Sequence, residues 1–265
     1  IYQSEITEEH KYRAGISFLF DQFEEQFFGN RYDRIERVPG AFFEYTFNPD
    51  EHFSVVAGIR ADNHNFYGFM FTPRLHVRYS PHEDWVFRAA AGKGYRTSNI
   101  FVEYASAFAS SRDINIQTQN NFGYGLAQES AWNFGLNATY YFLYEYRDAS
   151  IIIDFYRTYF EKVNIANLDS SPQQISFYSV DNGAYSNSLQ VELNIEPFQF
   201  FNTRLAYRFV DAKQIINGSW MEKPFSAKHR ALLNLAYSTQ KETIDDPQML
   251  FDFTLQWFGS KRIPS

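Results

Sequence analysis

Cysteine is absent from this sequence of 265 residues, which excludes a disulfide framework and any metal site built from thiolates. The sequence also lacks a run of about 18 apolar residues, the length that a transmembrane helix requires. It contains no GxSxG, no HExxH and no glycine-rich phosphate loop, so these catalytic and nucleotide-binding motifs are excluded. An excess of basic residues is missing as well. The net charge is −7, whereas a nucleic-acid surface requires clustered lysines and arginines.

Aromatic residues are abundant instead. The chain has 29 phenylalanines, 19 tyrosines and 4 tryptophans, yet its mean hydropathy is only −0.43. The aromatic residues are therefore interleaved with polar ones rather than gathered into apolar blocks. From Phe71 to Tyr79, for example, odd positions are apolar and even positions carry threonine, arginine or histidine. Alternation with a period of two predicts a β-strand with one apolar and one polar face.

About eleven segments alternate in this way, and many are roughly ten residues long or longer, which is more than strands of soluble proteins usually have. A tilted strand needs about 9–11 residues to cross a bilayer. A soluble β-sandwich with one solvated face is the alternative, but it does not explain the strand lengths. The predicted strands cover about residues 10–21, 41–48, 53–62, 71–79, 85–91, 132–142, 149–163, 189–196, 202–212, 230–238 and 251–257.

The connections alternate between short turns and longer, more varied loops. The short ones are NPDE, SPHED, LYEYRD and EPFQFFN, and the largest loop runs from GYRTSN to AQES. The link STQKETIDDPQM is an exception, because it is long on the side of the short turns. Short turns on one rim and long loops on the other are typical of an outer-membrane β-barrel. The fold class that we predict is therefore all-β, an antiparallel transmembrane β-barrel.

The alternation assigns side chains to two environments. Arginine at the bilayer midplane costs about 2–4 kcal/mol on the lipid side, so the charged face is expected to line the lumen, where it can contact water or a plug. The lumen-facing candidates are Arg60, Arg74, His76, Arg78, Glu192 and Arg230. The lipid-facing candidates are Val55, Ile59, Leu75, Val77, Phe134, Leu136, Leu193, Leu233 and Leu235. Pro73 interrupts an otherwise regular strand, and we expect it near the start of the strand, at a rim or bulge.

Several segments resemble the TonB-dependent outer-membrane receptors of the Bacteroidetes type. They are TPRLHVRYSP, GKGYRTSNIF, QESAWNFGLNATYYF, FYSVDNGAYSNSLQVELNIEP, EKPFSAKHRALLNLAY and LQWFGSKRIP, spread from about Phe71 to the end of the chain. The resemblance implies a barrel of 22 strands around an N-terminal plug. The chain shows neither a plug, a TonB box nor a signal peptide. We therefore expect residues 1–265 to form part of an outer-membrane barrel domain, without the plug, the early strands and the closing strands.

The same resemblance implies that extracellular loops and the upper lumen bind a solute. The loop that follows GKGYR is the first candidate, because Tyr95 could stack on a ligand and Arg96 could attract an anion. A structural role, in which Arg96 only holds the loop, is the alternative. The candidate substrate-binding residues are Tyr95, Arg96, Asn99, Phe122, Tyr124 and Trp220.

Catalytic and metal sites are not expected. The six histidines show no paired ligand spacing. His64, near Asp62, is the one considered for a metal or haem iron, and His229, near Ser226, is the one considered for a phospholipase. We predict no enzyme, no metal site and no cofactor.

The predicted function is TonB-dependent import of a scarce solute across the bacterial outer membrane. A metal chelate, haem, a cobalamin and a glycan all remain open as the solute. The expected partners are the TonB complex, through a plug, outer-membrane lipid, a small-molecule ligand and a surface lipoprotein, with no nucleic acid. A passive porin and a surface adhesin or interaction barrel are the alternatives.

Overall fold

Eleven long antiparallel strands make up most of the chain in a computed structural model that describes residues 1–27, 29–240 and 247–264. They are β2 (His10–Phe23), β5 (Arg34–Phe47), β6 (Phe53–His64), β7 (Gly68–His82), β8 (Trp85–Arg96), β10 (Glu129–Tyr144), β11 (Arg147–Asn167), β12 (Gln174–Phe198), β13 (Phe201–Ile216), β15 (His229–Ser238) and β16 (Leu250–Phe258). The shorter elements are β1 (Tyr2–Glu5), β3 (Gln26–Phe27), β4 (Asn30–Arg31), α1 (Ile100–Glu103), α2 (Ala105–Phe108), β9 (Asp113–Ile116) and β14 (Ser219–Glu222). No helix in this part of the chain is long and apolar enough to span a membrane.

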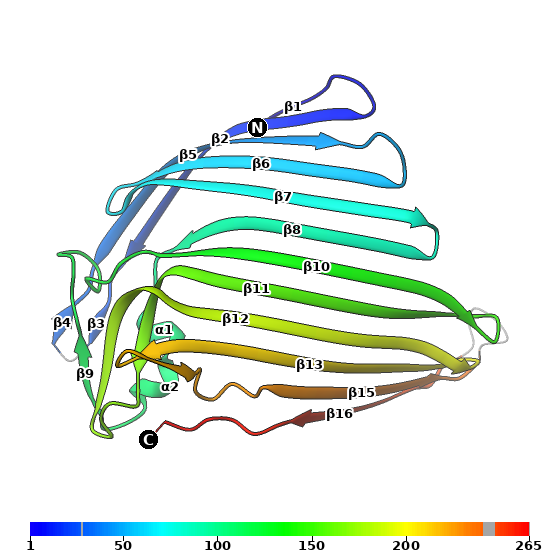
Figure 1. Cartoon of the computed structure of the whole chain (residues 1–265). Coiled ribbons are helices and arrows are strands. Elements are labelled where there is room, and N and C mark those ends of the chain that lie inside the picture. The colour runs from blue at the N-terminus through cyan, green and yellow to red at the C-terminus, as the bar shows by residue number, and fades with distance from the viewer. Residues whose placement is uncertain (28, 241–246, 265) are drawn as a thin grey trace.

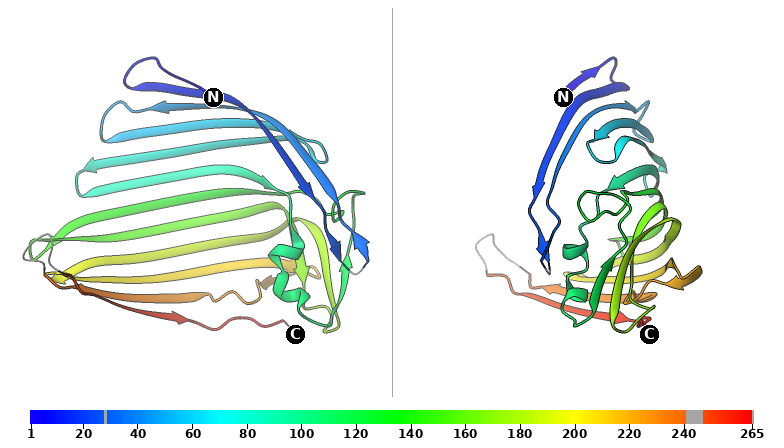
Figure 2. Two further views of the ribbon diagram at one scale, coloured as in Figure 1. Left: turned by 180° about the vertical axis from the view of Figure 1, so that it is seen from behind. Right: turned by 90° about the vertical axis from the view of Figure 1, so that its left-hand side faces the viewer.

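The strands follow one another in space almost as they do in sequence. The sheet order is β1-β2-β5-β6-β7-β8-β10-β11-β12-β13-β15-β16, with β14 paired to β13 and β9 paired to β12. The sheet curves into an open arc, with α1 and α2 on its concave side (Figures 1 and 2). The predicted fold class and the predicted number of long strands are confirmed.

The two ends of the sheet differ, as the connection lengths predict. At one end the described turns are short: residues 48–52, 83–84, 145–146 and 199–200. Glu145 and Tyr146 have φ values of 49° and 65°, the left-handed conformation that a tight two-residue hairpin requires. The opposite end carries the long connections, including residues 97–128, and is called the loop end here (Figure 1). Half of the link STQKETIDDPQM, residues 241–246, lies outside the described residues.

One face of the sheet is apolar across many strands. The ladder joins Leu193 to Leu205, Leu233 and Leu255 on four neighbouring strands, and their side chains lie on the same side because paired residues share a face. Leu205 and Leu255 are 43% and 55% exposed. All nine residues predicted to face lipid share this face, and all six predicted to face the lumen share the other. That the apolar face meets lipid stays a prediction.

The strands extend further toward the loop end than the alternation predicts. β11 reaches Asn167 and β12 begins at Gln174, whereas the sequence pattern places residues 174–188 outside a strand. Likewise β13 continues to Ile216 and returns through β14, where a loop is expected. The physical reason is that these extensions lie beyond the apolar band, toward the loop end. Neither of their faces therefore needs an apolar residue at every second position. A register shift between Phe160 and Lys162 marks the change in β11.

The expectation for Pro73 is wrong. Pro73 lies inside β7, five residues after the strand begins at Gly68. The strand is longer than the sequence pattern predicts, and β6 pairs with it on both sides of the proline. Proline is compatible with this position because its missing amide hydrogen affects only one of the two neighbouring ladders.

Candidate functional site

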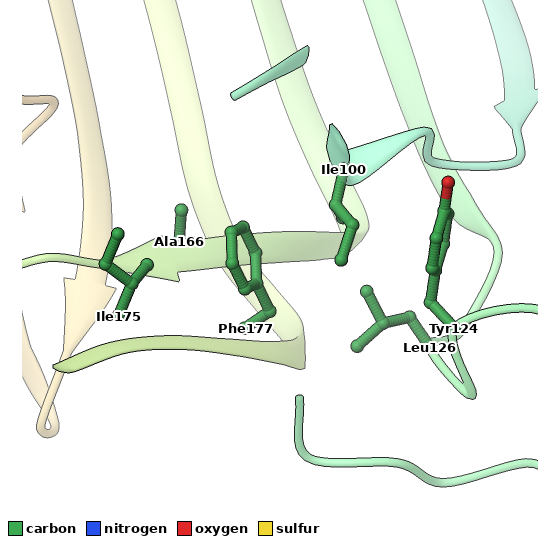
Figure 3. Close-up of a cluster of buried hydrophobic side chains, with 6 residues drawn as sticks. All are labelled: Ile100, Tyr124, Leu126, Ala166, Ile175 and Phe177. Carbon is green, nitrogen blue, oxygen red and sulfur yellow. The ribbon is translucent and has the colours of Figure 1, made fainter. Parts of the chain in front are cut away.

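The loop of residues 97–128 is packed rather than extended. Ile100, Tyr124 and Leu126 from this loop are nearly fully buried together with Ala166 of β11 and Ile175 and Phe177 of β12 (Figure 3). β9 of the same loop pairs in parallel with the start of β12. Burial of these side chains, at roughly 1.5–3 kcal/mol for each large one, holds the loop over the concave side of the sheet. The loop, with the strand extensions that it contacts, is our candidate site.

A buried charge cluster connects this loop to the barrel wall. The side chain of Arg34, at the start of β5, is only 2% exposed. Its Nε lies 2.8 Å from Oε1 of Glu36, and its Nη1 lies 3.0 Å from Oε2 of Glu25. Its Nη2 donates to the side-chain oxygen of Asn99 in the loop. Because the guanidinium is neutralised by two carboxylates, its burial is tolerated.

Aromatic side chains surround the same arginine. The guanidinium carbon lies 3.7 Å from the centre of the Phe23 ring and 5.1 Å from that of Tyr124. The hydroxyl of Tyr124 donates to Glu25 at 2.5 Å. Burial, assisted by the hydrogen bond to Glu25, raises the pKa of Tyr124. Burial also raises the pKa of Tyr104, between α1 and α2, to about 12. Both phenols are therefore neutral at physiological pH and act as hydrogen-bonding and packing groups.

Arg96 has the holding role that was considered as the alternative to ligand binding. At the end of β8 its guanidinium pairs with Glu129, at the start of β10, and with Glu103 of α1 at 3.1 Å. Glu129 is buried and also accepts from the backbone amide of Asn164. Arg96 thus closes the base of the loop, although its side chain remains 58% exposed and available on the concave side.

The structure separates the six predicted substrate-binding residues. Arg96, Asn99, Phe122 and Tyr124 belong to the loop assembly on the concave side, where Phe122 stacks on Phe66 with ring centres 4.5 Å apart. Tyr95 and Trp220 lie on the opposite, apolar face. Tyr95 shares its face with Lys93 and Trp132, and Trp220 contacts Tyr185 at the outer rim. These two lie with the aromatic residues at the edge of the apolar band, apart from the loop assembly on the concave side.

Three arginines on the polar face of the strands form ion pairs, and two others have different contacts. Arg60 pairs with Asp62, Arg74 with Glu44, and Arg204 with the buried Glu192. Arg78 donates to the backbone oxygen of Glu51 at 2.8 Å, and Arg230 lies over the Phe258 ring at 5.6 Å. His76 occupies the expected face in the same ladder. These groups line the concave surface below the loop assembly.

The histidines considered for chemistry have other partners. His64 is buried, and its Nε2 lies 3.3 Å from Glu36 within the Arg34 cluster. Nδ1 of His229 lies 2.6 Å from the hydroxyl of Tyr207. Among the described residues, no group of three histidine, cysteine or acidic side chains is placed to hold a metal ion.

Sequence reasoning missed Arg34, Glu36 and Glu129, which organise the site. A signal was present in the sequence. Arg34, Glu36 and Val38 are even-numbered positions of β5, and the even positions later in the same strand face inward. Their burial could not be inferred, because it depends on a loop that contacts them from 65 and 90 residues further along the chain.

Comparisons with known proteins agree with this architecture. Residues 6–262 match the family described as "TonB dependent receptor-like, beta-barrel". No curated protein sequence matches the chain. Similar solved structures include the ferric enterobactin receptor PfeA of Pseudomonas aeruginosa in complex with BCV-L6. It has a TM-score of 0.64 at 11% identity, over 94% of this chain and 39% of that one.

Two further structures give the same result. The siderophore receptor PirA from Pseudomonas aeruginosa has a TM-score of 0.64 at 12% identity, over 94% of this chain and 45% of that one. The FrpB iron transporter from Neisseria meningitidis has a TM-score of 0.59 at 13% identity, over 91% and 39%. Identities this low show a shared fold alone, and the chain spans less than half the length of each of these structures.

Proposed function

Because this chain belongs to the TonB-dependent receptor β-barrel family, we propose that the protein imports a scarce solute across the bacterial outer membrane with energy supplied through TonB. The observation that carries the proposal is the folded loop assembly held over the concave, charged face by Arg34 and Arg96. A receptor needs such a cover, because it must bind solute outside and admit it only when energy is supplied. A passive porin needs an open lumen instead.

The barrel that performs this import requires more than the strands described. β1 and β16 are the two ends of the strand order and are not paired with each other. In a membrane, unpaired strand edges are costly, and a closed sheet removes them. We propose that further strands close the barrel, that a plug fills it, and that the plug transmits the force from TonB. A surface lipoprotein that delivers solute to the loop end is a further proposed partner.

The first solute class to test is a ferric chelate. The similar structures are a ferric enterobactin receptor, a siderophore receptor and an iron transporter. In this chain, Arg96 offers a guanidinium that remains more than half exposed beside the loop, which suits the anionic groups of a chelate. Haem, cobalamins and glycans are the other classes.

The test is uptake by whole cells that express the full-length protein. Accumulation of a radiolabelled solute from each class is measured in cells with and without a functional TonB. We expect accumulation of one class that disappears without TonB. Uptake that persists without TonB would indicate a passive porin, and absence of uptake together with cell-surface binding would indicate an adhesin.

A further inference from the structure

The pairing between β7 and β8 stops before either strand ends. The last pair toward the loop end is Arg74 with Gly92. Beyond it β7 continues back to Gly68, paired only with β6, and β8 continues to Arg96, paired only with β10. Among the described residues, the ladder contains no residue pair between residues 68–73 and residues 93–96. Figure 1 shows β7 and β8 separating toward the loop end.

Pro73 explains why the ladder ends there. A Cβ built on Gly92 would lie 3.4 Å from the carbonyl oxygen of Pro73, so the backbone of Pro73 faces β8. In an antiparallel ladder a residue that faces its neighbour uses both its amide and its carbonyl. Proline has no amide hydrogen, and the next bond toward the loop end cannot form.

At a second proline, Pro39, a side chain bridges the corresponding break in the ladder. Pairing of β5 with β6 ends at Gly40 and Asp62, next to Pro39. There the side chain of Asn65 accepts from the amide of Arg37 at 2.8 Å and donates to the carbonyl of Ile35 at 2.9 Å. The separation beside Pro73 has no such bridge among the described residues, so it is an opening in the wall.

The opening is bounded on all sides and leads into a cavity. Above it, Phe66 stacks on Phe122, and the hydroxyl of Tyr67 donates to the carbonyl of Leu126 at 3.3 Å. The cavity of about 510 Å³ is lined by Arg60 and Arg74 from the polar face and by Lys93 and Tyr95 from the apolar face. A Cβ built on Gly94, which also lines it, would meet no atom within 4 Å.

The chemistry of the lining is amphipathic and cationic. Arg60 and Arg74 remain 41% and 53% exposed although each pairs with a carboxylate. Lys93 pairs with Glu161 at 2.5 Å, so each of the three cations that line the cavity has a carboxylate partner. On the apolar face, Phe69 and Phe71 beside the opening are 70% and 43% exposed. The opening therefore joins an apolar surface to a cavity in which two guanidinium groups remain accessible.

We propose that the opening between β7 and β8 is a lateral port that binds an anionic amphiphile with a single hydrocarbon chain. The anionic head lies against Arg60 and Arg74 on the concave side, and the chain passes beside Gly94 to the surface of Phe69 and Phe71. A long-chain carboxylate has this form. The proposal uses the membrane orientation of the proposed function but needs neither TonB nor transport.

The experiment uses the full-length protein in lipid nanodiscs without TonB. Hexadecanoic acid carrying a diazirine on its chain is photo-crosslinked, and the labelled peptides are mapped by mass spectrometry. We expect labelling in residues 68–73 and 93–96, reduced by unlabelled hexadecanoic acid. Pro73→Val restores the missing amide, and Gly94→Trp fills the opening. Both are expected to lower the labelling several-fold, whereas the control Pro39→Val leaves it unchanged.

Two outcomes would overturn the port. One is labelling spread evenly over the apolar face and unaffected by Gly94→Trp, a variant whose new side chain enters open space. The other is equal labelling of the same residues by a phosphatidylglycerol with the same diazirine chain, which would indicate an ordinary lipid contact. Unboiled gel migration reports whether each variant is folded. Because the assay contains no TonB, its failure leaves the import proposal intact, and failed import leaves the port intact.

Discussion

At the scale of single residues, Arg34 carries the connection between the barrel wall and the loop assembly. Its guanidinium satisfies Glu25 and Glu36, and it donates to Asn99 of the loop. A charge buried without its partner is far more costly than a buried pair. Arg34 therefore holds the loop against the barrel wall, together with Arg96 and the buried apolar cluster.

Replacing Arg34 with methionine should release the loop. The change leaves the buried Glu36 and the partly buried Glu25 without their arginine, and breaking a buried pair in this way costs about 3–5 kcal/mol. Hydrogen exchange of the full-length protein should show loss of protection in residues 97–128. The part of β10 that follows Ser130, and the part of β11 paired with it, should keep their protection. Arg37→Met is the matched control, because Arg37 lies on the same strand, on the opposite face, and is exposed. Equal protection in the two variants would contradict this role.

At the scale of elements, alternation along a strand decides what each side chain meets. In β13, Leu205 lies in the apolar rung with Leu193 and Leu233, whereas Ala206 lies on the polar face, paired with Glu192. The two residues are neighbours in sequence and differ only in the direction of their side chains. Substitutions at these two neighbouring positions therefore compare the environment of one face with that of the other.

Leu205→Arg and Ala206→Arg should have opposite consequences. Arginine on the apolar face should lower the free energy of unfolding from a bilayer by about 2–4 kcal/mol near the midplane. Arginine at position 206 lies beside Glu192 and should cost about 0.5 kcal/mol or less. Urea titration of the full-length protein in liposomes measures both values. A similar loss in the two variants would argue that the apolar face does not meet lipid.

At the scale of the whole molecule, the strand order and the two unlike ends define a wall rather than a compact core. The buried apolar residues gather mainly at the loop end, whereas the long strands expose Leu136, Leu205 and Leu255. A soluble sandwich would bury such residues between two sheets. A single curved sheet that keeps them outward requires an apolar solvent.

The full-length protein should therefore behave as a closed membrane barrel. Extracted from outer membranes and left unboiled, it should migrate faster in a gel containing dodecyl sulfate than after boiling, because a closed sheet resists unfolding by the detergent. Identical migration of the two samples would count against barrel closure.

The fold class, the eleven long strands and the two faces were predictable from the sequence, because the side-chain period of a strand is two. The residues of the site were harder to predict from the sequence. Arg96 and Asn99 follow directly from the end of a strand, whereas Tyr95 and Trp220 lie on the face opposite the loop assembly, and their part in ligand binding stays a prediction. Their face depends on the register and length of strands that continue beyond the regular pattern.

Alternation alone determined that the protein is a sheet with one apolar and one charged face, because successive side chains of a strand point to opposite faces. Only the tertiary structure decided which loop residues are buried around Arg34, because those contacts join positions up to 99 residues apart. It also decided that Pro73 opens the wall while Pro39 does not. The difference lies in the side chain of Asn65, which reaches across one break and has no equivalent at the other.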